Sequence, residues 1–279
     1  MMKEKELKKY LNKSFSMKPI PSETTQSLHE STLRLIDHFM NLQIDGKKIQ
    51  CPYFLNKATK VRAALGVLIG KGTPEDIEEE AKIISLKHHL DLASIPQEKL
   101  KEFLVDNNLG IDCSGLAYHI LHQEVRATKA KPLKLFYPHA KSFFRKILVR
   151  LRPAENCSVE TLVSDMNTKV VQLSQVTPGD MIILLGTGKD HDLNHILVIH
   201  AIEYNPLSPV IIHYTHALQW KRDGKYGGGV RKGHIEITDH NTSLLEQTWT
   251  ENEKTGEENE TFWRAKTAQR CEIRRLHAL

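Results

Sequence analysis

The sequence predicts an α+β protein, with helices in its first part and strands in its second. Apolar residues recur at helical spacing between Leu28 and Met40, and two further helix-start signals follow before residue 100. From residue 181 onward, β-branched and aliphatic runs are bounded by turn residues, which is typical of strands. Between the two parts, Gly110 and a short polar segment lead into a helical pattern that starts near Cys113. We therefore expect Cys113 to lie where the two parts meet.

The composition is that of an ordinary globular protein. Of 279 residues, 40% are hydrophobic and 26% are charged, so the chain can bury a full core. No window approaches about 18 consecutive apolar residues, and the charged start of the chain leads into no apolar signal segment. We expect a cytoplasmic protein without a membrane span. The formal net charge of +5 permits an acidic partner without requiring one.

We divide the chain into three parts. Residues 1–20 lack a sustained apolar face and are predicted to be a flexible basic arm. Residues 21–105 are predicted to be an N-terminal helical region. Residues 106–279 carry Cys113 and the predicted strands, and they include a basic insertion at about 125–165.

Three helices are predicted in the N-terminal region. Ser22 or Thr24 is expected to cap the first. Thr73 precedes a proline and acidic residues, which indicates a second helix reaching about Leu90. A third is predicted to begin after Pro96 and to end near residue 110.

Cys113 and His195 are the candidate reactive pair. Unpaired N–H groups and the dipole at a helix start stabilise a thiolate, so we expect the pKa of Cys113 to fall. His195 opens an apolar strand that follows a Pro-Gly-Asp turn and another apolar strand. A thiol with a nearby imidazole is what nucleophilic cleavage of an amide requires. The other cysteines, Cys51, Cys157 and Cys271, form no Cys-x-x-Cys pair and are expected to be reduced.

These stretches resemble a known family. Asp112-Cys-Ser-Gly-Leu116, then Pro178-Gly-Asp180 with its strand, then His195 with the next strand are similar to the NlpC-type cell-wall cysteine peptidases, over about residues 105–235. The resemblance implies a papain-like fold, with the nucleophile helix packed on an antiparallel sheet behind an N-terminal helical extension. It also implies hydrolysis of an amide bond in small peptides, of the peptidoglycan stem type, through a Cys-His-His thioester mechanism without a metal or other cofactor.

The resemblance gives roles to further residues. The third catalytic residue is expected on the strand after His195, where His216 precedes an alanine as in the family and His213 is the alternative on the opposite face. Asp112 and Ser114 stand where the family binds the amino end of a stem peptide, although each also suits a helix cap. Tyr53 follows a proline in a segment that would line the cleft, and a packed aromatic is its alternative role.

The basic insertion has two interpretations. Lysines and arginines alternate with aromatics between residues 125 and 152, a pattern that suits contact with an anionic polymer such as nucleic acid. Alternatively, a helix over roughly residues 139–151 buries apolar side chains and leaves its lysines in solvent. We expect the second arrangement. The buried set would be Phe143, Phe144, Ile147 and Leu148.

The last part of the chain is predicted to be mainly strands. Val210–Ala217 and His234–Thr238 alternate between apolar and polar residues. Residues 227–233 are predicted to be a flexible glycine-rich connection, residues 249–260 an acidic loop, and residues 271–276 a closing strand.

Other functions stay open at this point. The same cleft suits a non-catalytic module that holds a peptide or an anionic polymer, or an amidase or acyltransferase with another substrate. His191 is a competing base, and His191, His195 and His200 invite a zinc interpretation, which the β-branched residues of a strand argue against. The predicted partner is a small peptide or peptidoglycan fragment, and the sequence predicts no oligomeric state.

Overall fold

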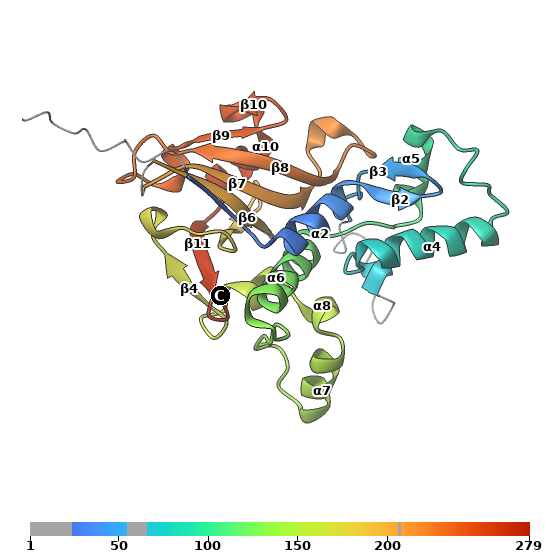
Figure 1. The fold of residues 1–279 in the computed structure, drawn as a ribbon, viewed down its shortest axis with the longest axis horizontal. Coiled ribbons are helices and arrows are strands. Elements are labelled where there is room, and N and C mark those ends of the chain that lie inside the picture. Colours follow the sequence, from blue (N-terminus) through green and yellow to red (C-terminus); the bar gives the residue numbers. More distant parts are fainter. Residues whose placement is uncertain (1–23, 55–65, 206–207) are drawn as a thin grey trace, which may run out of the picture.

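A computed structural model describes residues 24–54, 66–205 and 208–279. The predicted arm at residues 1–20 and Ser22 as a helix cap lie outside the described residues. Figure 1 shows one large twisted sheet with helices packed around it. Neighbouring strands of the sheet are antiparallel. The predicted α+β class is therefore confirmed as a large antiparallel sheet with several helices.

The sheet has nine strands within the described ranges. In spatial order they are β10 (Lys254–Thr255), β9 (Thr248–Glu251), β8 (Gly229–Glu236), β7 (Ser208–Leu218), β6 (Leu193–Asn205), β5 (Met181–Thr187), β11 (Arg270–Leu276) and β4 (Thr168–Val171), while β1 (Thr24–Ser27) pairs with β6. A separate hairpin consists of β2 (Leu42–Ile44) and β3 (Lys47–Ile49). The predicted closing strand, β11, thus lies inside the sheet between β5 and β4.

The helices after Thr73 and Pro96 and the helix at Cys113 begin where the sequence predicts. The described helices are α2 (Glu30–Met40), α4 (Pro74–Lys87), α5 (Gln97–Asp106), α6 (Cys113–Lys129), α7 (Phe143–Leu151), α8 (Pro153–Asn156), α9 (Val159–Val163) and α10 (Glu260–Thr267). Thr73 forms a full capping box with Asp76 at the start of α4. Within the described residues, no helix is both long and apolar enough to cross a membrane.

The N-terminal region contains strands as well as helices, which the sequence did not predict. Thr24 lies in β1, so it does not cap α2; His29 does, by accepting a hydrogen bond from the Ser31 N–H. All four side chains of β1 are exposed, so no apolar alternation marks this strand in the sequence. It forms instead through backbone pairing with β6.

Two predicted loops are also strands. Residues 229–233 belong to β8, although residues 227–233 were predicted to be a flexible connection. The glycines there are needed for packing, because a Cβ atom on Gly229 would lie 2.7 Å from the Cys51 carbonyl oxygen, and one on Gly233 would collide with Tyr214. Residues 248–251 form β9, with Trp249 and Glu251 both buried, so the predicted acidic loop is also wrong there.

Each face of the sheet has its own apolar core. Ile183 and Ile196 pack with α2 and α6 in the first core. Ile182 and Leu197 point to the other face, where they pack with Trp249 and α10 in the second core. This alternation follows the period of two of a strand. Leu28, Ile36 and Phe39 of the N-terminal region belong to the first core, so this region is part of the same packed body.

Helix α7 differs from the prediction in which residues it buries. Phe143 is 72% exposed and Phe144 is 82% exposed, and Ile147 and Leu148 are also exposed. Val149 is the buried residue of this helix. In Figure 1, α7 lies at the bottom of the view, away from the sheet, where only one side of it meets the protein. The predicted burial of these four residues is therefore wrong.

We predict that Ile36→Ala lowers the free energy of unfolding by about 2–5 kcal/mol, because it leaves a cavity between α2 and α6. Ile83→Ala is the matched control, since Ile83 also lies in a helix but is 51% exposed and should change stability by about 0.5 kcal/mol or less. Urea unfolding followed by circular dichroism measures both. Equal effects of the two substitutions would contradict a shared core.

Candidate active site

Cys113 is the first residue of α6, and two other segments of the chain hold the backbone that leads into this helix. The Asp112 carboxylate accepts a hydrogen bond from the Gly115 N–H at 2.6 Å and caps the helix. The Asp112 N–H donates to the Gly70 carbonyl oxygen at 2.9 Å, and Tyr53 forms a β-bridge with Ile111. The chain before the helix is therefore held by two segments that are far away in sequence.

The thiol of Cys113 is buried, and this overturns the expected fall of its pKa. The residue is 9% exposed. Burial raises the pKa of Cys113 to about 12, and the Asp112 carboxylate adds to this rise. Lys71 and the backbone groups of Ile196 and Ser114 act in the opposite direction but are outweighed. Desolvation of the anion thus exceeds the benefit of the helix start.

His195 and His216 meet inside the sheet. His195 Nε2 lies 2.8 Å from His216 Nδ1, and both residues are 1% exposed. The register explains the contact: Val198 of β6 lies opposite Thr215 of β7, which makes the two histidines diagonal neighbours on one face. Burial holds the pKa of His195 well below its usual range, and the charges of His216 and Arg264 add to this effect.

Glu251 extends this pair, and the sequence interpretation missed it. Its Oε2 lies 2.9 Å from His216 Nε2 and accepts a hydrogen bond from the Tyr214 hydroxyl at 3.0 Å. Its Oε1 lies 3.6 Å from Arg231 Nη1. Burial by itself would raise the pKa of Glu251, but His216, Arg231 and Tyr214 together lower it below its usual value. The carboxylate is therefore held as an anion in the sheet.

The anion determines which histidine nitrogens carry protons. A carboxylate only accepts hydrogen bonds, so His216 presents Nε2–H to Glu251. In the neutral form of His216 the lone pair is then on Nδ1, and His195 donates Nε2–H to it. This leaves Nδ1 of His195 with a lone pair. That nitrogen is the one free to accept a proton.

Gly233 makes the contact with Glu251 possible. In the sheet register, Gly233 of β8 lies opposite both Tyr214 of β7 and Glu251 of β9. A Cβ atom on Gly233 would collide with the Tyr214 ring and hydroxyl. The missing side chain therefore lets Tyr214 reach across β8 to the carboxylate. A sequence signal for Glu251 did exist, because it shares the period-two face of the apolar residue Trp249.

Arg231 connects the carboxylate to the rest of the protein. It is 4% exposed, and its Nη2 donates to Asp223 Oδ2 at 2.6 Å. Its guanidinium lies 4.9 Å from the ring centre of Trp220. A buried charge needs an opposite charge nearby, and Arg231 provides one for Glu251 at 3.6 Å without a hydrogen bond to its Oε1.

The other candidate histidines lie elsewhere. His213 Nε2 bonds to Glu203 at 2.7 Å, and its ring packs 6.0 Å from that of His200, so the structure brings His216 and not His213 to His195. His191 Nδ1 bonds to the Gly186 carbonyl oxygen. The histidines of the zinc interpretation therefore have separate partners, and among the described residues no group of three or more His, Cys, Asp or Glu is arranged to hold a metal ion.

Cys113 contacts β6 at the residue next to His195. The Cys113 sulfur faces the backbone of Ile196, the residue that follows His195. Within the described part of the chain, no hydrogen bond joins the thiol to the imidazole. Hydrogen bonds of a catalytic pair are often long before substrate binds. Cys113 therefore lies against the strand that carries His195.

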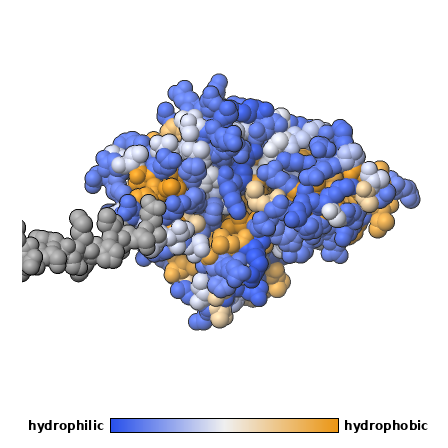
Figure 2. All heavy atoms as spheres, turned by 45° about the horizontal axis from the view of Figure 1, so that its top comes forward, coloured by the Kyte–Doolittle hydropathy of each residue, from blue (hydrophilic) through white to orange (hydrophobic). Residues whose placement is uncertain are grey.

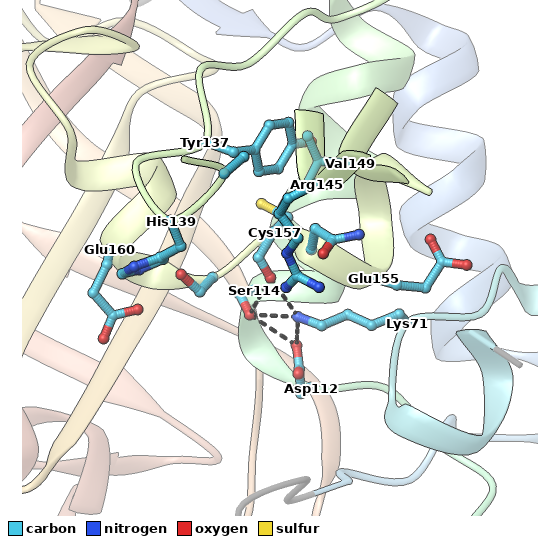
Figure 3. Close-up of a pocket in the computed structure, with 13 residues that line it drawn as sticks. Lys71, Asp112, Ser114, Tyr137, His139, Arg145, Val149, Glu155, Cys157 and Glu160 are labelled. Atoms are coloured by element: carbon cyan, nitrogen blue, oxygen red, sulfur yellow. Dashed lines mark hydrogen bonds and ion pairs between the residues drawn. The ribbon is translucent and has the colours of Figure 1, made fainter. Parts of the chain in front are cut away.

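Lys71 lies near Cys113, and its side chain binds Asp112 and Ser114, two of the predicted substrate-binding residues. Its ammonium group donates to Asp112 Oδ1 at 2.8 Å, to Ser114 Oγ at 2.6 Å and to the Cys157 carbonyl oxygen at 2.9 Å (Figure 3). Asp112 and Ser114 are thus engaged with an internal cation. The sequence did not predict this role of Lys71.

A cavity of about 480 Å³ opens next to these residues. Lys71, Asp112 and Ser114 line one side, and Arg145 and Val149 of α7 line another. Figure 3 shows the Arg145 side chain extending towards the ammonium group of Lys71. The basic insertion therefore forms a wall of this cavity.

A second cavity, of about 280 Å³, contains the other predicted residues. Tyr53 and His195 line it together with Trp220 and Arg264. Burial raises the pKa of Tyr53, and the neighbouring Cys113 and Asp112 raise it further. Tyr53 is therefore half-buried, lines this cavity and lies close to Cys113.

We predict that native Cys113 reacts slowly with iodoacetamide at pH 8. A thiol with a pKa of about 12 has roughly 1000-fold less thiolate at that pH than a thiol with a pKa of about 9. Timed labelling and peptide mass spectrometry, on the native protein and on the same protein unfolded in urea, measure the difference. Fast labelling of native Cys113 below pH 7 that His195→Ala abolishes would indicate a thiolate–imidazolium pair and contradict this expectation.

Comparison with known proteins finds no relative of this chain. No protein-family model matches the chain, and neither a curated protein nor a solved structure matches it.

Proposed function

We propose that the protein is a cysteine peptidase or amidase of the papain-like type, with Cys113 as nucleophile and His195 as base. The observation that carries this proposal is the buried chain from His195 through His216 to Glu251, which begins next to a thiol at a helix start. It supplies the three functions that amide cleavage by a thiol requires: a nucleophile, a base and a group that orients the base.

The reaction follows from the protonation states in the site. As the Cys113 sulfur attacks the amide carbon, its proton passes to Nδ1 of His195. The carbonyl oxygen becomes an oxyanion near the N–H groups at the start of α6. The C–N bond then breaks, the amine leaves with the proton from His195, and a thioester remains. Water, deprotonated by His195, attacks the thioester and releases the acid and the thiol.

His216 and Glu251 act on the charge that His195 gains. When His195 becomes an imidazolium, His216 accepts its Nε2–H, and the Glu251 anion stabilises the positive charge through His216. Because His195 is buried, this stabilisation is little screened by water. Burial lowers the pKa of His195 in the free protein, so its charged form needs a stabilising partner during the proposed reaction.

The proposed substrate is a small peptide of the peptidoglycan stem type that carries a carboxylate near the cleaved bond. In the resembled family the positions of Asp112 and Ser114 bind an amino group, but here the Lys71 ammonium takes those acceptors. The cavity lining carries Asp112, Glu155 and Glu160 as well as Lys71 and Arg145. Because Lys71 is held by Asp112, Arg145 is the cation that we propose to bind the substrate carboxylate.

We predict that His216→Ala lowers kcat/KM by roughly 100-fold to 10,000-fold on stem peptides, because His195 loses its orienting partner. His213→Ala is the matched control and should stay within about twofold, since His213 lies against Glu203. Product analysis by liquid chromatography and mass spectrometry measures both. Denaturing mass spectrometry should also detect the thioester on Cys113.

The same experiment separates the alternatives. Products with a new amide or ester would identify an acyltransferase, because another nucleophile has then replaced water. Peptide binding without a thioester, unchanged in Cys113→Ala, would identify a non-catalytic binding module. Loss of turnover in His213→Ala alone would reverse the assignment of the third residue.

We further predict that amidating the substrate carboxylate raises KM by about tenfold in the wild type, because the peptide loses its charge-assisted hydrogen bond to Arg145. Arg145→Gln should raise KM for the free acid and leave KM for the amide nearly unchanged. Initial rates with both peptides measure this. Equal KM values for the two peptides in the wild type would contradict an anionic subsite.

A further inference from the structure

We propose that α7 binds the surface of a lipid bilayer that contains anionic lipids. The proposal concerns the outer side of α7, here called the α7 face. It consists of Phe143 (72% exposed), Phe144 (82%), Ile147 (41%), Leu148 (39%) and Leu151 (75%). An exposed cluster of large apolar side chains marks an interaction surface.

The α7 face is continuous because of helical geometry. At about 100° per residue, its five positions fall within one arc of roughly 140°. Val149 lies on the opposite side, where it is buried, and Arg145 lies next to Val149 and lines the cavity of the candidate site. The helix therefore meets the protein with its narrow inner side and turns its apolar arc to solvent. This is the reverse of a helix that covers a core.

The helix is formed before any partner binds. Ser142 caps its start by accepting a hydrogen bond from the Arg145 N–H at 3.3 Å. At its end, the Arg152 N–H donates to the Leu148 carbonyl oxygen at 2.9 Å. A partner that binds the α7 face therefore does not bear the cost of ordering this segment.

The charge around the α7 face indicates the partner. Residues 125–154 contain nine Lys and Arg and no Asp or Glu. Because the whole chain has a net charge of +5, the residues outside this segment are net negative. Lys141, Lys146 and Arg150 are exposed. Within the described ranges, none of these three has an acidic partner. Basic side chains at the border of an apolar helix face are the pattern of helices that lie on anionic membranes.

A lipid surface explains the face better than a nucleic acid does. Nucleic-acid binding would use aromatic rings for stacking beside cations, but Ile147, Leu148 and Leu151 offer no such contact. All five side chains gain from transfer out of water. Figure 2 shows hydrophobic patches among hydrophilic atoms on the lower lobe of the molecule, the part that carries α7 in Figure 1. Because Arg145 and Val149 line the cavity from the inner side of α7, binding would hold the candidate site close to the bilayer.

The test is flotation of the full chain with vesicles of phosphatidylcholine alone or mixed with phosphatidylglycerol. We expect binding to the mixed vesicles, weaker at high salt, and little binding to the neutral ones. Phe144→Ser with Leu151→Ser should weaken binding by at least about tenfold, since two large apolar contacts are lost. Lys141→Gln with Lys146→Gln and Arg150→Gln should weaken it by roughly 100-fold.

Matched controls use residues with the same chemistry on other surfaces. Leu86→Ser with Met166→Ser removes side chains that are 75% and 66% exposed. Lys82→Gln with Lys87→Gln and Lys169→Gln removes the same charge as the basic variant at other exposed positions. Both controls should bind within about twofold of the wild type. Because all these side chains are exposed, circular dichroism should show every variant folded.

Several results would overturn the proposal. They are absence of binding to anionic vesicles at low salt, equal losses in the control variants, and binding of a nucleic acid without binding of vesicles. Self-association that the Phe144→Ser and Leu151→Ser variant abolishes, without vesicle binding, would assign the face to a second copy of the chain. Flotation measures vesicle binding and not turnover, so a negative result would contradict the membrane proposal without bearing on the proposed peptidase activity.

Discussion

The burial of the Glu251 carboxylate is the constraint on which the rest of the site depends. An isolated anion inside a sheet is unstable, so Tyr214, His216 and Arg231 must all reach it. These partners come from β7 and β8, and Tyr214 reaches the carboxylate because Gly233, which lies between them, has no side chain. The anion in turn fixes the proton of His216 and, through it, that of His195. The pairing of strands thus fixes the hydrogen-bonded chain from His195 to Glu251.

The same exclusion of water has an opposite effect on the nucleophile. It raises the pKa of Cys113 and lowers that of His195, so both groups are neutral in the free protein near neutral pH. A neutral pair gives little reaction with small electrophiles. In the proposed reaction, a bound amide would let the sulfur attack as its proton leaves for His195, and His216 and Glu251 would stabilise the resulting charge. Under this proposal, burial ties the reactivity of the thiol to the presence of substrate.

The basic insertion has two different sides. Its inner side contributes Arg145 to the cavity beside Lys71 and Asp112. Its outer side is the α7 face, which carries Phe144 and Leu151 into solvent. A short helix that meets the protein only around Val149 can serve both sides at once. This arrangement explains why the same residues are basic, aromatic and aliphatic in close succession.

The sequence by itself determined the helix that starts at Cys113 and the strands that follow His195, because these depend on local caps and a period of two. The preference for His216 over His213 came from the resemblance to the peptidase family. Only the tertiary structure decided the role of Glu251, which is 35 residues from His216, and of Lys71, which is 41 residues from Asp112. It also decided that the thiol is buried and that the apolar arc of α7 faces outward. A periodic pattern tells which residues share a face, but not what that face meets, because burial and charge depend on segments brought together only by folding.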